Sequence, residues 1–268
     1  MIRRLLNFPY WLFTVLPTRY VLDRIEGWVR IRPHGKRLWI HEYSSCPSLV
    51  VQGKSADWAS ELEAIKNSPF FRYYTPKAHE VVVSVGAGIG TEAFIASEMV
   101  GEIGCVLAIE GDPTAFTQLV LGIQSNRYGN VLPFNGLVAE SPGWGKFFLG
   151  DESGKDFTTS SMFGNTTNGV KLPTFTLDQI LSFSQIRHVD LLLMNIEGAE
   201  LRALSGLSVL PKRMVISCHD FLGDDVRSTY DDVNNWLVDR GYKVLKFDEV
   251  PERPWESFYI FGELSERG

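Results

Sequence analysis

Three glycines at alternate positions, Gly86, Gly88 and Gly90, come directly after the apolar run Val81–Val85. An apolar run of this length that leads into a cluster of glycines predicts a strand followed by a tight loop. Glycines between a strand and a helix allow positive φ angles and let the backbone approach a ligand closely. The loop is therefore the first candidate binding site, and it favours a nucleotide-like ligand.

The spacing of these glycines separates two classes of cofactor. In the dinucleotide fingerprint, Gly-x-Gly-x-x-Gly, the third glycine comes five positions after the first. Here that position is Thr91, and the third glycine is Gly90. The Gly-x-Gly-x-Gly spacing is typical of loops that bind S-adenosylmethionine, which has no pyrophosphate. S-adenosylmethionine is the expected cofactor, and a nicotinamide-dependent oxidoreductase is the less favoured alternative.

A carboxylate stands where a ribose would need one. Glu110 ends a second apolar run, twenty residues after Gly90, and at a strand end it can accept hydrogen bonds from both ribose hydroxyls. The alternative for Glu110 is structural, as a surface carboxylate or one that interacts with a helix dipole. The predicted cofactor-binding residues are Ser84, Gly86, Ala87, Gly88, Ile89, Gly90, Glu110, Gly111, Asp112, Gly136, Leu137 and Asn195.

His219, Glu197 and Asp220 are the candidate catalytic residues, because each follows a predicted strand. His219 is the preferred general base, since the ordinary pKa of histidine lies near neutral pH. A histidine base must be neutral, so activity is expected to rise with pH through one ionisation. Glu197 can instead be the base or orient His219. The structural alternatives are a buried, hydrogen-bonded histidine and a carboxylate that satisfies a helix N-terminus.

No metal site is expected. Asn195, His219 and Asp220 offer oxygen and nitrogen ligands, but Mg²⁺ prefers carboxylates and only one of these residues is acidic. Cys218 stands beside His219, but a cysteine that ends an apolar strand is more often packed than nucleophilic. The three cysteines of the chain lack metal-ligand spacing and are typical of free thiols in a reducing compartment.

From Val81 onward the predicted elements alternate between strands and helices, which indicates an α/β fold. The run Asp190–Ile196 is apolar almost throughout, as in a strand that is buried on both faces of a parallel sheet. The last two predicted strands are joined by a loop with two prolines that holds no crossover helix, so they should pair antiparallel. The predicted strands are 81–85, 105–110, 131–134, 190–196, 214–218, 242–247 and 257–261.

Residues 1–55 are expected to form an N-terminal extension, made of an apolar arm and a β-hairpin, ahead of a Rossmann-like domain over residues 56–268. The hairpin is predicted from alternation within Val29–His41, and a helix is expected over residues 56–66. Residues 1–17 contain an apolar run that is too short to span a bilayer. We expect this arm to pack on the domain; a peripheral membrane contact is the alternative, and a cleaved signal is less favoured.

The charge of the chain bears on its partners. A formal net charge of −6 and a pI near 5.5 disfavour a nucleic-acid binder, which needs clustered Lys and Arg to neutralise phosphates. The expected location is the cytoplasm, because the N-terminal apolar run is too short to span a bilayer and no small-residue cleavage site follows it. The membrane-peripheral alternative is left open by the same arm.

Four segments together carry a family resemblance, which covers the chain from about Trp58 to Gly262. They are the loop Gly86–Gly90, "IEGDPTAFTQL" from Ile109, "TLDQI" from Thr176 and "NIEGAELRALSGL" from Asn195. With these segments the chain resembles the FkbM-type S-adenosylmethionine-dependent methyltransferases. The resemblance implies a class I methyltransferase-like, doubly wound sheet of seven strands, mostly parallel with a C-terminal antiparallel hairpin. It also implies methyl transfer to a hydroxyl of a small molecule or sugar.

The chain departs from this family at several strand ends. The family usually has Asp at the position of Ser84 and a Lys-x-Asp pattern at the positions of Leu193 and Asn195, and often Glu at that of Ser217. The favoured interpretation is a divergent branch with a different acceptor. The alternative is a non-catalytic protein that keeps the fold and binds S-adenosylmethionine or another nucleotide.

Overall fold

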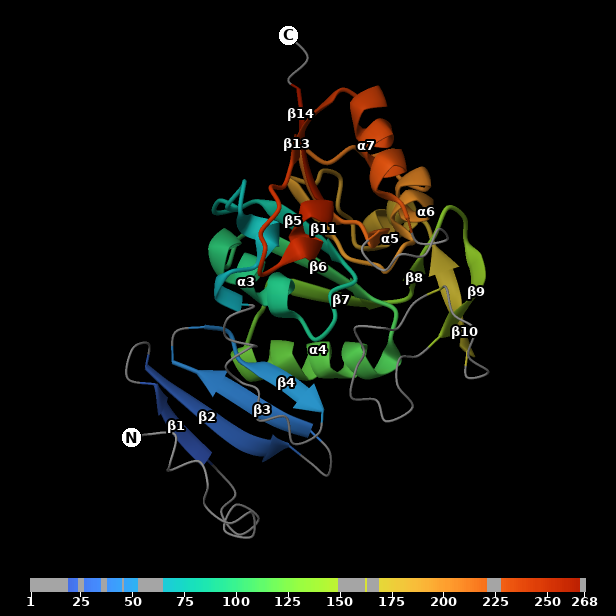
Figure 1. Cartoon of the computed structure of the whole chain (residues 1–268). Helices are drawn as coiled ribbons and strands as arrows, with labels where there is room; N and C mark the ends of the chain where they lie inside the picture. The colour runs from blue at the N-terminus through green and yellow to red at the C-terminus, as the bar shows by residue number, and fades with distance from the viewer. Residues whose placement is uncertain are drawn as a thin grey trace.

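The computed structural model describes residues 19–23, 27–34, 38–44, 46–52, 65–148, 162, 169–220 and 228–265. Its centre is a seven-stranded sheet in which the strands follow the order β13-β14-β12-β11-β5-β6-β7 (Figure 1). All pairs are parallel except those that β14 makes with β12 and β13. The strands are β5 (Val81–Val85), β6 (Cys105–Glu110), β7 (Val131–Asn135), β11 (Leu191–Met194), β12 (Arg213–Ser217), β13 (Tyr242–Lys246) and β14 (Tyr259–Leu264).

This topology confirms the predicted fold class, including the antiparallel hairpin at the C-terminal end. Within the described ranges, the helices that flank the sheet are α3 (Thr91–Val100), α4 (Pro113–Asn126), α5 (Leu177–Phe183), α6 (Glu200–Ser205) and α7 (Tyr230–Asp239). Single-turn 3₁₀ helices are η2 (Pro69–Phe71) and η5 (Pro254–Phe258).

The central strands are apolar throughout because helices cover both faces of the sheet. Neighbouring residues of one strand point to opposite faces. Val82 packs in the core cluster that holds Phe94 of α3, whereas Val83 packs in the cluster that holds Ile180 of α5 and Leu237 of α7. The continuous apolar runs of β5 and β11 follow from this burial on two sides.

Local signals fix where two of the helices begin. The Asp112 carboxylate accepts hydrogen bonds from the backbone N–H groups of Thr114 (2.7 Å) and Ala115 (3.1 Å), and Pro113 takes the first helical position of α4. Both features are typical of helix starts. At the start of α5, Thr176 and Gln179 form a capping box, in which each side chain bonds to the backbone of the other.

The N-terminal part forms an antiparallel sheet in the order β1-β2-β3-β4. It contains the predicted hairpin, as β2 and β3, and adds a strand on each side. The strands are β1 (Arg19–Asp23), β2 (Gly27–His34), β3 (Leu38–Tyr43) and β4 (Leu49–Gln52). The side chain of Asn126, at the end of α4, joins this sheet to the domain through hydrogen bonds of 2.8 Å to both the N–H and the C=O of Ser48.

Some expectations fall outside the described residues. The apolar arm 1–17 lies there, and of the helix expected over residues 56–66 only Ile65 and Lys66 are described, in helical conformation. None of the helices within the described ranges combines the length and the apolar character needed to cross a bilayer.

A small third sheet lies beside the carboxyl ends of the central strands. Strand β10 pairs parallel with β8 and antiparallel with β9. Figure 1 shows it on the side of the molecule that carries α5 and α6. Its strands are β8 (Leu137–Val138), β9 (Gly143–Phe148) and β10 (Gly169–Phe175).

Candidate functional site

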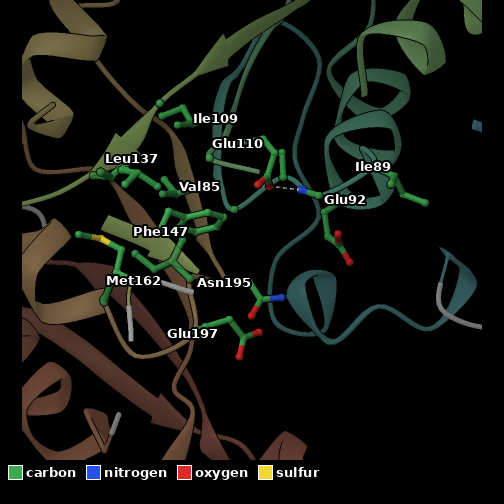
Figure 2. Close-up of a pocket in the computed structure, with 18 of the residues that line it drawn as sticks. Val85, Ile89, Glu92, Ile109, Glu110, Leu137, Phe147, Met162, Asn195 and Glu197 are labelled. Carbon is green, nitrogen blue, oxygen red and sulfur yellow. Dashed lines mark hydrogen bonds between the residues drawn. The ribbon is translucent and has the colours of Figure 1, made fainter. Parts of the chain in front are cut away.

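A cavity of about 440 Å³ opens at the carboxyl ends of β5, β6 and β11 (Figure 2). In open α/β sheets this edge is where ligands bind. Most of the residues predicted to bind the cofactor line the cavity, namely Gly86, Ala87, Gly88, Ile89, Glu110, Gly111, Gly136, Leu137 and Asn195.

Three predicted cofactor residues lie outside the lining of this cavity in the described structure. Ser84 is buried within β5, Gly90 is the residue before α3, and Asp112 caps α4. Their places in the fold give them structural roles. Nine of the twelve predicted cofactor residues therefore line the cavity, and these three do not.

Sequence reasoning missed several lining residues. Glu92 follows the glycine loop by two positions, and Phe147 comes from the small third sheet. Leu49 comes from β4 of the N-terminal sheet, and Met162 lies between two segments that are not described. Only Glu92 carried a sequence signal, as a carboxylate in the first turn of the helix that follows the loop.

The glycine loop needs glycine for reasons within the protein itself. Gly86, Gly88 and Gly90 have φ angles of 76°, 55° and 105°, which other residues rarely adopt. A Cβ atom on Gly86 would lie 1.9 Å from the backbone carbonyl oxygen of Asn195. The loop is therefore pressed against the end of β11, which leaves the opposite side of its backbone facing the cavity.

Glu110 is held by backbone donors. Its Oε2 accepts from the N–H of Gly88 (2.7 Å) and its Oε1 from the N–H of Asp112 (2.6 Å). Burial raises the pKa of Glu110 to about 7, against the opposing effect of these hydrogen bonds. Each carboxylate oxygen can accept more than one hydrogen bond, so Glu110 keeps acceptor capacity toward the cavity.

His219 is buried between two carboxylates. Its Nδ1 lies 2.9 Å from Oε1 of Glu200, and its Nε2 lies 3.1 Å from Oε1 of Glu197. Burial alone would lower the pKa of His219, but the hydrogen bonds and the negative charges of both glutamates outweigh it and raise the pKa to about 9. At neutral pH the ring is therefore an imidazolium that donates from both nitrogens.

This geometry is against the expectation that His219 is the general base. Its ring is 3% exposed and already protonated, so it has no lone pair to offer a substrate. The Glu197 side chain is 20% exposed and lines the cavity. The sequence also suggested that Glu197 orients His219. The structure fits the reverse arrangement, in which the buried His219 orients the cavity-lining Glu197.

Glu200 completes the support behind His219. It is fully buried, its Oε1 accepts from the N–H of Gly198 (3.0 Å), and its Oε2 accepts from the hydroxyl of Thr229 (2.9 Å). A chain of hydrogen bonds thus runs from Thr229 at the start of α7, through Glu200 and His219, to Glu197 at the cavity.

Asp220 has a structural place. Its carboxylate accepts from the Ser228 hydroxyl (2.6 Å) and from the N–H groups of Thr229 (3.0 Å) and Tyr230 (3.1 Å). It therefore satisfies the free donors at the start of α7 and does not line the cavity. The expected catalytic role of Asp220 does not fit this arrangement.

Two further expectations concern a metal ion and the thiol of Cys218. No group of three or more His, Cys, Asp or Glu side chains within them is placed to hold a metal ion. Cys218, beside His219, is buried, and burial raises the pKa of its thiol well above the ordinary value. A thiol in this environment stays protonated and is a poor nucleophile.

The sheet order, the glycine loop and the strand-end cavity define a class I methyltransferase-like protein. The family model described as "Methyltransferase FkbM domain" matches residues 84–244, which is more than half of the chain. The chain therefore belongs to the FkbM methyltransferase family, as the sequence indicated, and S-adenosylmethionine is the cofactor of that family. No curated protein matches the sequence.

Solved structures with a similar fold include an FkbM methyltransferase from Methylobacillus flagellatus KT, with 17% identity and a TM-score of 0.47 over 68% of this chain and 43% of that one. This chain thus spans less than half of that protein. Another is M. jannaschii TYW2 in complex with AdoMet, with 16% identity and a TM-score of 0.44 over 87% and 89% of the two chains. A third is Aeropyrum pernix fibrillarin with natively bound S-adenosyl-L-methionine, with 11% identity and a TM-score of 0.44 over 90% and 99%.

Proposed function

We propose that this protein transfers the methyl group of S-adenosylmethionine to a hydroxyl of a small molecule or sugar, with Glu197 as the general base. The observation that carries the proposal is the Glu197 carboxylate at the cavity, fixed from behind by the His219 imidazolium. When bound, the cofactor supplies a methyl group on a positively charged sulfur. The residues of the chain supply binding, orientation and a place for the proton.

The residues that line the cavity are of the types that would bind this cofactor. The backbone of the glycine loop faces the cavity, and the Glu110 carboxylate at the end of β6 keeps acceptor capacity there, which supports its proposed hydrogen bonds with the ribose hydroxyls. Apolar side chains, among them Leu137 and Phe147, form much of the remaining wall and suit the flat adenine ring of the cofactor.

Glu197 can take the hydroxyl proton because it is the cavity-lining member of the Glu197–His219 pair. Its Oε1 is bonded to His219, which fixes the orientation of the carboxylate. Methyl transfer is an in-line displacement, so positioning provides much of the rate and a base near the acceptor oxygen adds to it.

The test measures methyl transfer to a panel of sugar and small-molecule hydroxyls. We expect wild-type protein to methylate at least one acceptor, and Glu197→Gln to lower the maximal rate by about 10²- to 10⁴-fold, the usual range for a general base. Cofactor affinity should change little. Glu102→Gln, at an exposed position between α3 and β6, is the matched control and should keep full activity.

Two results would contradict the proposal. Protein that binds S-adenosylmethionine but methylates no hydroxyl would favour the non-catalytic alternative. Full activity of Glu197→Gln would show that positioning alone carries the reaction.

A further inference from the structure

A third carboxylate at the cavity, beside Glu110 and Glu197, has no role in the reaction described above. Glu92 is the second residue of α3 and lines the cavity. Figure 2 shows its side chain directed into the same open space as those of Asn195 and Glu197. Its side-chain partner among the described residues is the hydroxyl of Ser68, at 3.3 Å.

The charges around this cavity are unbalanced. The described lining contains three carboxylates, Glu92, Glu110 and Glu197, and no Lys, Arg or His. Glu110 accepts from backbone N–H groups and Glu197 is paired with the His219 imidazolium. Glu92 forms no ion pair with any described residue, and its burial raises its pKa. Burying a carboxylate without a counter-charge is costly, so a cationic group of a ligand would bind favourably there.

The ligand proposed for this cavity carries two positive centres, a sulfonium and an α-ammonium. An ammonium has three N–H donors, whereas a sulfonium has none, so a carboxylate gains charge-assisted hydrogen bonds only from the ammonium. Glu110 marks the ribose end of the ligand, and Glu92 follows the glycine loop, in the first turn of α3.

We propose that Glu92 binds the α-ammonium group of the amino-acid part of S-adenosylmethionine. This inference rests on the proposed function for the presence of the cofactor. It adds that this chain recognises the amino-acid part of the cofactor through a carboxylate on α3, supported by the Ser68 hydroxyl from the segment before β5.

Three ligands isolate the contact. S-adenosylmethionine has both positive centres, S-adenosylhomocysteine keeps only the ammonium, and 5′-methylthioadenosine has neither but retains the adenosine. Binding is measured by calorimetry above neutral pH with the full chain as wild type, Glu92→Gln and Glu110→Gln. The glutamine at position 92 is isosteric and can still accept from Ser68.

We expect Glu92→Gln to weaken binding of the first two ligands by about 10- to 150-fold, as for hydrogen bonds to a charged group. Binding of 5′-methylthioadenosine should be unchanged. Glu110→Gln is the matched control at the ribose end and should weaken the binding of all three ligands to a similar extent.

Other patterns would overturn the inference. If only the binding of S-adenosylmethionine weakens, Glu92 faces the sulfonium instead of the ammonium. If the binding of all three ligands weakens equally, Glu92 acts on the shape of the loop. If the binding of none weakens, Glu92 makes no contact with the ligand. If wild-type protein binds none of the three, the cofactor assignment of the proposed function fails first.

Discussion

Glu197 and Glu200 are three positions apart, yet they bond to opposite nitrogens of one imidazole ring. The backbone makes this possible, because Glu197 and Gly198 have φ angles of 53° and 96°. The left-handed region costs roughly 1–2 kcal/mol for a residue with a Cβ atom. At Glu197 this strain coincides with the residue that we propose as the base, and it sets the direction in which the carboxylate faces.

The pKa of His219 gives a test at the level of one residue. Its pKa is raised from the ordinary 6.5 to about 9, so the fold favours the charged ring. The resulting stabilisation is fully present below about pH 6.5 and is lost as the pH rises through about 9. The advantage of wild type over His219→Gln in free energy of unfolding should therefore shrink across this range, by a total of the order of 3 kcal/mol.

Urea unfolding at a series of pH values measures this difference. His79→Asn, at an exposed position with a positive φ angle, is the control and should leave the pH dependence of stability unchanged. Methyl transfer should also fall, not rise, as the pH passes about 9, because the ring that holds Glu197 loses its charge. A stability difference that stays constant with pH would mean that His219 is uncharged in the folded protein.

At the scale of the elements, the site depends on how closely the loop after β5 meets the end of β11. Gly86→Ala adds a methyl group 1.9 Å from a backbone oxygen of Asn195 at a φ of 76°. Both the left-handed conformation and the clash oppose the substitution. We expect a loss of more than about 2 kcal/mol in the free energy of unfolding, beyond the roughly 1–2 kcal/mol of the left-handed region alone.

Gly241→Ala separates these two effects. Gly241 also has a positive φ, of 83°, but a Cβ atom there would meet nothing within 4 Å. In this control the free energy of unfolding should fall only by the cost of the left-handed backbone conformation. Chemical denaturation of both variants measures the comparison, and equal losses would refute the close approach of the loop to β11.

At the scale of the whole molecule, the N-terminal sheet takes part in the site. Leu49 of β4 lines the cavity although it lies outside the segment that matches the family model. The adjacent Ser48 is tied to α4 by the two hydrogen bonds from Asn126. The N-terminal sheet and the strand ends of the seven-stranded sheet therefore both contribute residues to the wall of the cavity.

Removing this tie should affect both parts of the molecule. Asn126→Ala leaves the part-buried backbone groups of Ser48 without these partners, which should cost about 1 kcal/mol, the lower end of the range for a buried group. We expect a lower free energy of unfolding together with weaker binding of S-adenosylmethionine, measured by denaturation and calorimetry. Asn235→Ala, at an exposed position on α7, is the control. Unchanged cofactor binding in a destabilised Asn126→Ala protein would show that the sheet does not shape the cavity.

Much of the fold was predictable because its signals are local. The apolar runs of β5 and β11, the cap at Asp112 and the glycines that follow α3 and α7 act within a few residues. The antiparallel pairing of β13 and β14 followed from the short connection between them. The glycine loop and Glu110 were found for the same reason, since both lie within one βαβ unit and their spacing can be read along the chain.

The tertiary structure alone decided how the charged residues work. The sign of the pKa change at His219 depends on Glu197 and Glu200, which reach it from another strand end, and sequence spacing does not encode that contact. The tertiary contacts favour Glu197 over His219 as the base and show that Asp220 binds the start of α7. They also bring Glu92 and Leu49 to the cavity. Burial and the distance between charges set these properties, and both arise only when segments far apart in the chain pack together.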